Sequence, residues 1–151
     1  MTTRSELTQS VPSAPPRTSS VLFQLRVEGL AVAAVTAALY AHTGAGWWLF
    51  AALWLAPDLS MLGYLGGNSC WGARIYNTFH TYVLPGALGF SALLLNAHNL
   101  LPFALIWANH IGVDRLLGYG LKFSDGFGYT HLGRIGGRRA ALIEGSRSPT
   151  A

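Results

Sequence analysis

Charged side chains are scarce in this chain of 151 residues, where Asp, Glu, Lys and Arg together make up 11%. A soluble domain usually carries about a quarter of charged residues, and the mean hydropathy of this chain is positive, at +0.35. The shortage argues against an ordinary soluble domain and favours a lipid bilayer. The net charge of +4 lies outside the apolar runs, a pattern typical of membrane proteins rather than of nucleic-acid-binding surfaces. We therefore expect no nucleic-acid partner.

Cysteine is nearly absent too, and Cys70 stands alone. A single cysteine excludes a disulfide framework and a cysteine-rich zinc motif. Ser, Thr and Pro dominate residues 1–20, which predicts a disordered tail, and no A-x-A cleavage site of a signal peptide follows. Residues 138–151 are predicted as a second disordered tail.

Long apolar runs, by contrast, are abundant. A helix needs about 20 residues to cross a hydrocarbon core of roughly 30 Å, and four runs reach that length. They are residues 21–43, 47–66, 75–96 and 99–120. The sequence therefore predicts an all-α fold, a four-helix transmembrane bundle over residues 21–137 that includes a C-terminal cytoplasmic loop. Pro57 is expected to kink the second helix.

The basic residues predict how the bundle is oriented. The links at 44–46 and 97–98 contain no Lys or Arg, and cytoplasmic loops carry the excess of these residues. Both termini are therefore expected in the cytoplasm, in a multi-pass protein of the cytoplasmic (inner) membrane. The basic residues that support this orientation are Arg4, Arg17, Arg26, Arg74, Lys122, Arg134, Arg138 and Arg139.

Each predicted helix carries an ionisable side chain in its cytoplasmic half. An ionised group inside a membrane helix costs at least about 2.5–3.5 kcal/mol unless it is paired or hydrated. Convergence on one cavity inside the bundle removes much of this cost. His110 and Asp114 are four residues apart and so share a helix face. The predicted cluster contains Glu28, Asp58, His80, His110 and Asp114.

These residue types suit two kinds of chemistry. Imidazoles and carboxylates bind Zn²⁺ or a similar divalent cation, with Glu28 as the general base that activates a bound water. Without a metal, buried carboxylic acids could protonate an apolar substrate with histidine as base. The predicted metal ligands are Asp58, His80, His110, Asp114 and His131, and the predicted catalytic residues are Glu28, Asp58, His110 and Asp114.

Three functions follow as alternatives. The first is a metal-dependent hydrolase that takes a lipid-like substrate from the bilayer, and the second is a metal-free isomerase or cyclase with a similar substrate. The third is a non-enzymatic membrane protein, either a proton-coupled carrier or a partner subunit for assembly. Four short helices form a narrow bundle, so a carrier is expected to form a homo-oligomer. A purely structural role for the polar cluster is the remaining interpretation.

Five ordered motifs are spread over about residues 22–137. They are VEGL (27–30), APDLSMLGYLGG (56–67), YNTFHTY (76–82), HIGVDRLLGYGLKF (110–123) and THLGRIG (130–136). Together they resemble a bacterial integral-membrane family known as domain of unknown function 4260. This resemblance implies a membrane protein and does not imply a reaction. The chain is also loosely similar to YdjM-type membrane metal-dependent hydrolases, to which Pro57-Asp58, His80-Thr81 and Thr130-His131 correspond in kind, although their fuller run of histidines and aspartates is absent.

Overall fold

The computed structural model describes residues 19–124 and 128–134, and the prediction of an all-α fold is confirmed. A sheet of two two-residue strands accompanies the helices in this part of the chain. The elements are α1 (Ser19–His42), α2 (Trp47–Leu53), the 3-10 helix η1 (Ala56–Gly66), α3 (Ser69–Phe79), α4 (Val83–Leu94), the 3-10 helix η2 (His98–Leu100), α5 (Leu101–Leu117), β1 (Tyr129–Thr130) and β2 (Gly133–Arg134). Of the predicted disordered tails, Ser19 and Ser20 belong to α1, and the other residues lie outside the described part.

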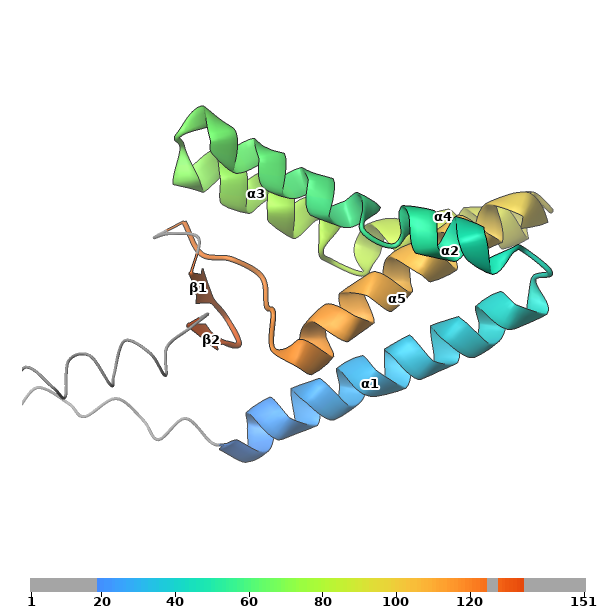
Figure 1. Cartoon of the computed structure of the whole chain (residues 1–151), viewed down its shortest axis with the longest axis horizontal. Coiled ribbons are helices and arrows are strands. Elements are labelled where there is room, and N and C mark those ends of the chain that lie inside the picture. Colours follow the sequence, from blue (N-terminus) through green and yellow to red (C-terminus); the bar gives the residue numbers. More distant parts are fainter. Residues whose placement is uncertain (1–18, 125–127, 135–151) are drawn as a thin grey trace, which may run out of the picture.

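Helices α1 and α5 pack side by side and antiparallel (Figure 1). Glycine allows this close approach, because a Cβ atom at Gly29 would lie 2.7 Å from the Gly112 carbonyl oxygen. Further along the pair, the Asn109 amide nitrogen donates to the Ala33 carbonyl oxygen at 2.7 Å. Beyond it, Tyr40 contacts Leu105 and Ile106 in a small apolar core.

The second predicted helix is broken into α2 and η1. Pro57 lies in the first turn of η1, where its missing N–H group costs little, whereas the same ring inside a continuous helix would clash with the preceding turn. The expected kink is therefore a change of helix type. At the other end of η1, Gly67 adopts a left-handed conformation with φ of 71°. The side chain of Asn68 then caps α3 by accepting bonds from the Cys70 and Trp71 N–H groups.

The third predicted helix is also divided, into α3 and α4. Helix α3 ends at Phe79, and His80 follows with φ of −109° and ψ of 20°. Pro85 is the third residue of α4, where backbone N–H groups have no partner within the helix in any case. The break leaves His80 at the end of a helix, and its side chain points toward α5.

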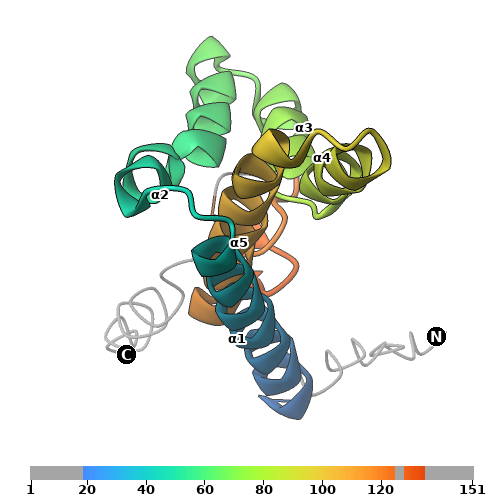
Figure 2. The ribbon, with the colours of Figure 1, turned by 90° about the vertical axis from the view of Figure 1, so that its right-hand side faces the viewer.

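Helix α5 lies between α1 on one side and the pair formed by η1 and α3 on the other, in both views (Figures 1 and 2). Helix α4 packs against α5 as well. The start of η1, the end of α3 and the second half of α5 therefore meet at one place, where Asp58, His80, His110 and Asp114 lie.

The segment after α5 folds back onto α3. The Asn77 side chain accepts from the Lys122 N–H group at 2.7 Å and donates to the Lys122 carbonyl oxygen at 2.9 Å. Lys122 also forms an antiparallel bridge with Thr130 in β1, and β1 pairs with β2. The predicted cytoplasmic loop thus has a fixed path over its described residues.

Within residues 19–124 and 128–134, two segments are long and apolar enough to cross a membrane, Ser20–His42 and Trp47–Gly66. Many large apolar side chains are exposed, among them Trp48 at 75% and Leu65 at 81%. Monomeric soluble proteins rarely expose such extensive apolar surface. These observations favour a membrane location, and the four spans and the cytoplasmic position of both termini stay predictions.

Candidate metal centre

Four ionisable side chains from three elements converge where η1, α3 and α5 meet. Asp58 comes from the first turn of η1, His80 from the end of α3, and His110 and Asp114 from one face of α5. One ligand atom from each of these residues lies within 4.8 Å of the others. The two histidines are almost completely buried, whereas the side chains of Asp58 and Asp114 are 37% and 15% exposed.

Five of the distances within this cluster lie between 3.3 and 3.8 Å, and every pair of ligand atoms lies within 4.8 Å. The Nε2 atom of His80 lies 3.3 Å from Asp58 Oδ1, 3.6 Å from Asp114 Oδ2 and 3.3 Å from His110 Nε2. The Nε2 atom of His110 lies 3.5 Å from Asp58 Oδ1 and 3.8 Å from Asp114 Oδ2. A tetrahedral zinc ion with bonds of about 2.0–2.2 Å holds its donor atoms about 3.3–3.6 Å apart. The spacing therefore suits a small divalent cation.

The backbone of α3 fixes the tautomer of His80. Its Nδ1 atom lies 3.0 Å from the carbonyl oxygen of Tyr76, and a carbonyl oxygen only accepts, so Nδ1 carries a hydrogen. In the neutral ring the lone pair is then on Nε2, which faces the cluster. The ring also stacks on that of Tyr76, with centroids 3.7 Å apart. Metal-binding histidines typically donate their second ring N–H in this way.

His110 is held by packing instead. Its ring is 1% exposed and packs edge-on against the Trp54 ring, with the two ring centroids 5.1 Å apart. Within the described residues its Nδ1 atom has no hydrogen-bond partner, so no neighbour on that side selects a tautomer. Trp54 in turn donates from Nε1 to the Asn109 side-chain oxygen at 3.0 Å. Asn109 thereby connects this wall of the cluster to α1.

A positive charge would fit at the centre of the cluster. Asp58, Asp114 and the Nε2 atom of neutral His80 all present lone pairs to one small volume, and lone pairs at this separation repel unless a proton or cation lies between them. One added proton would make His80 an imidazolium ion, whereas a divalent cation would satisfy all four residues together. Two imidazoles with two carboxylates form a ligand set that Zn²⁺ accepts.

Basic and phenolic groups surround the cluster. The Tyr76 hydroxyl donates to Asp114 Oδ2 at 3.4 Å, and Arg115 donates from Nη2 to the His80 carbonyl oxygen at 2.9 Å. The Lys122 ammonium lies 4.5 Å from the centre of the Tyr76 ring. Burial lowers the pKa of Lys122 to about 8, although Asp58 and Asp114 act in the opposite direction.

A family model for a domain of unknown function, DUF4260, matches residues 23–135. The chain belongs to this family. The match includes all four cluster residues, and the family prediction made from the five motifs is confirmed. No curated protein and no solved structure matches the chain. The similarity to YdjM-type hydrolases is therefore not shown by these comparisons.

The structure does not bring Glu28 into the cluster. Gly29 faces α5 in the tight α1–α5 contact, and successive helix residues point about 100° apart. Glu28 is accordingly exposed. The sequence prediction placed Glu28 in the cluster, whereas in the structure it lies on another face of α1. A role for Glu28 as the general base of this cluster has no geometric support.

His131 also lies outside the cluster. Its Nδ1 atom accepts a hydrogen bond from the Leu121 N–H group at 2.8 Å, and its own backbone N–H donates to the Leu121 carbonyl oxygen at 3.0 Å. The ring is exposed. His131 therefore organises the segment after α5, and the four residues Asp58, His80, His110 and Asp114 form the candidate metal site without it.

The sequence interpretation missed the residues that support these ligands. Tyr76 contributes a carbonyl oxygen, a stacked ring and a hydroxyl group, and Trp54 packs on His110. One signal was available for Tyr76, because it lies four residues before His80 and residues at this spacing share a helix face. The contact between Trp54 and His110 joins distant segments and has no local signal.

Proposed function

We propose that this chain is a membrane-bound hydrolase that depends on a zinc-like divalent cation at the cluster, held by His80, His110 and Asp114 with Asp58 beside it. The observation that carries the proposal is the set of five donor–donor distances between 3.3 and 3.8 Å. The fixed tautomer of His80 supports it, because its hydrogen is on Nδ1 and its lone pair faces the other ligands.

The side chains of the four cluster residues differ in their exposed fraction, and this difference suggests different roles in hydrolysis. Catalytic zinc sites usually have three protein ligands and one open position, and His80, His110 and Asp114 are the three less exposed residues. Asp58 is the most exposed, so it lies on the side from which water and substrate arrive. A divalent cation in such a site lowers the pKa of a water molecule and polarises a carbonyl or phosphoryl oxygen. Asp58 would act as the general base that takes a proton from the attacking water.

The surroundings of the cluster support an amphiphilic, lipid-like substrate. The two apolar segments and the exposed apolar side chains favour a bilayer around the protein. Substrate then arrives from the cytoplasmic leaflet of the inner membrane, as the orientation predicted from the basic residues requires. A homo-oligomer is compatible with this arrangement, and the cluster itself is complete within one chain.

A chelation experiment tests the proposal. The protein is purified in detergent, stripped with a chelator, and assayed on a monoacylglycerol, a phosphatidic acid and a p-nitrophenyl ester before and after zinc is added. The result expected is hydrolysis of at least one substrate that chelation abolishes and zinc restores, in wild type and His98→Ala but not in His110→Ala. His98 is a matched control because it is exposed in η2, outside the cluster. Turnover that is insensitive to chelation would overturn the metal model and favour acid–base chemistry.

A further inference from the structure

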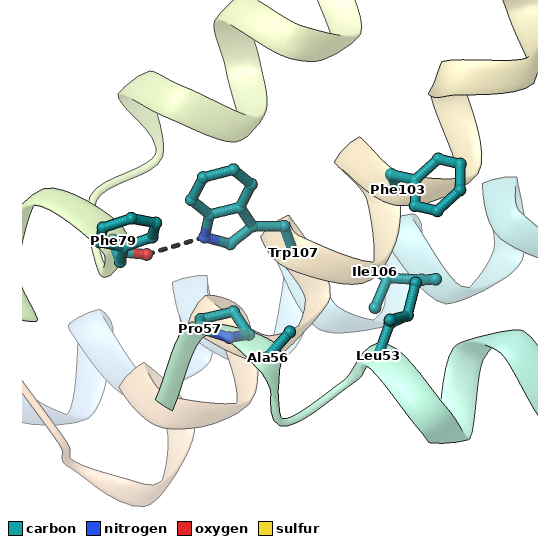
Figure 3. Close-up of a pocket in the computed structure, with 7 residues that line it drawn as sticks. All are labelled: Leu53, Ala56, Pro57, Phe79, Phe103, Ile106 and Trp107. Carbon is teal, nitrogen blue, oxygen red and sulfur yellow. Dashed lines mark hydrogen bonds between the residues drawn. The ribbon is translucent and has the colours of Figure 1, made fainter. Parts of the chain in front are cut away.

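An apolar cavity lies beside the cluster. Its volume is about 340 Å³, within the range of roughly 300–1,000 Å³ that is typical of small-molecule sites. Aliphatic and aromatic side chains form its wall, and no charged residue contributes to it. The lining residues are Leu53, Ala56, Pro57, Phe79, Phe103, Ile106 and Trp107 (Figure 3).

Each element that supplies a ligand to the cluster also supplies part of this wall. Pro57 directly precedes Asp58, and Phe79 directly precedes His80. On α5, Ile106 lies one helical turn before His110, on the same face. The cavity and the cluster thus draw on the same three elements, the first apolar and the second polar, and none of the four cluster residues lines the cavity.

The polar atom of Trp107 is already satisfied within this wall. Its Nε1 group donates to the Phe79 carbonyl oxygen at 2.8 Å, as Figure 3 shows, and the two rings stack with centroids 5.7 Å apart. The indole therefore presents its apolar surface to the cavity. This bond also ties α5 to the last residue of α3, next to His80.

We infer that the cavity binds the aliphatic chain of the substrate while the hydrolysable polar group lies at the cluster. The inference rests on the proposed function and defines the substrate more closely, as a molecule with an alkyl chain attached to its reactive group. An apolar wall gives affinity to methylene groups and offers nothing to a polar or charged extension. Short-chain analogues are then expected to bind by their polar group alone.

Alkyl hydroxamates provide the test, because the hydroxamate group chelates zinc and the chain length can be varied. The affinities of acetohydroxamate and octanohydroxamate are measured on zinc-loaded protein at one fixed detergent concentration. Burial of each methylene group is worth up to about fourfold in affinity. We expect octanohydroxamate to bind wild type at least about tenfold more tightly than acetohydroxamate.

Two matched variants separate the cavity from partitioning into the micelle. Ala56→Phe fills the cavity, whereas Leu55→Phe adds an aromatic ring at the preceding exposed position, outside the lining. The tighter binding of octanohydroxamate relative to acetohydroxamate should disappear in Ala56→Phe and persist in Leu55→Phe. The affinity for acetohydroxamate and the zinc content should be unchanged in both variants. An equal gain in both variants would overturn the inference and leave the proposed function intact. Absence of zinc from wild type would overturn both.

A second pair of variants tests the inference without depending on correct folding of Ala56→Phe. Phe103→Ala removes a wall residue that is 40% exposed, and Leu62→Ala removes an apolar side chain that is 60% exposed and outside the cavity. The chain-length gain should fall several-fold in Phe103→Ala alone. A gain that is equal in these two variants would contradict the inference as well.

Discussion

The Nε2 atoms of His80 and His110 lie 3.3 Å apart, although thirty positions separate the two residues in the chain. Since Nδ1 of His80 donates to the Tyr76 carbonyl oxygen, the neutral ring faces His110 with its lone pair. Two carboxylate oxygens approach the same volume. A shared cation would fit this arrangement.

Asp58 and Asp114 are expected to have different functions. In Asp58→Asn, zinc affinity should stay within about tenfold of wild type, while hydrolysis falls by about 10²–10⁴-fold, the usual contribution of a general base. Asp114 is less exposed, so Asp114→Asn should lose zinc and activity together. Zinc titration beside the hydrolysis assay checks this. Equal losses of zinc affinity in the two variants would contradict the division of roles.

The contact between α1 and α5 is expected to tolerate no added atom at Gly29. A Cβ atom there would lie 2.7 Å from the Gly112 carbonyl oxygen and from the Leu116 backbone nitrogen. Gly29→Ala should lower the free energy of unfolding by about 1–3 kcal/mol, a usual cost of overpacking. Gly86→Ala is the control, because a Cβ atom there meets nothing within 4 Å; it should raise stability by about 0.5–1 kcal/mol. Thermal unfolding in detergent measures both, and an unchanged Gly29→Ala protein would contradict the packing.

Stability should depend on pH through Lys122. Burial holds its pKa at about 8 in the folded protein, below the ordinary 10.5, so the unfolded chain binds more protons between these values. The contribution of Lys122 to the free energy of unfolding therefore rises as the pH increases from about 8 to 10.5. The metal-free protein and its Lys122→Met variant are compared by thermal unfolding across this range. The stability of wild type relative to Lys122→Met should increase as the pH rises. A stability difference that does not change with pH would contradict the burial of the ammonium.

Cys70 offers a test of the predicted orientation. It is exposed and lies between the second and third predicted spans, beside Arg74, on the side assigned to the cytoplasm. A membrane-impermeant maleimide should label it in inverted vesicles and leave it unlabelled in right-side-out vesicles. Cys70→Ser controls for nonspecific labelling. Labelling only in right-side-out vesicles would reverse the orientation.

The sequence predicted those parts of the site in which contacts between side chains depend on local helix geometry. His110 and Asp114 share a face of α5 because they are four residues apart, and the cost of burying charge suggested that Asp58 and His80 would join them. The structure brings these four residues together. Helical class and family followed from composition and motifs.

The sequence was less informative where contact depends on how elements pack. Counting residues along a helix gives depth but not the face that meets a neighbour, and Glu28 is exposed because Gly29 occupies the contact with α5. Proline indicated a kink at Pro57 but not a change to a 3-10 helix. The cavity beside the cluster joins residues from α2, η1, α3 and α5, which no local pattern connects.

The most direct test of the metal centre is the zinc content of the purified protein, measured by elemental analysis together with competition against a chelating dye. Wild type and His98→Ala should each bind one zinc ion per chain with the same affinity. His110→Ala should lose at least about tenfold in affinity while its helical circular dichroism is retained. Zinc content near zero in wild type, or the same affinity in wild type and His110→Ala, would contradict the metal centre.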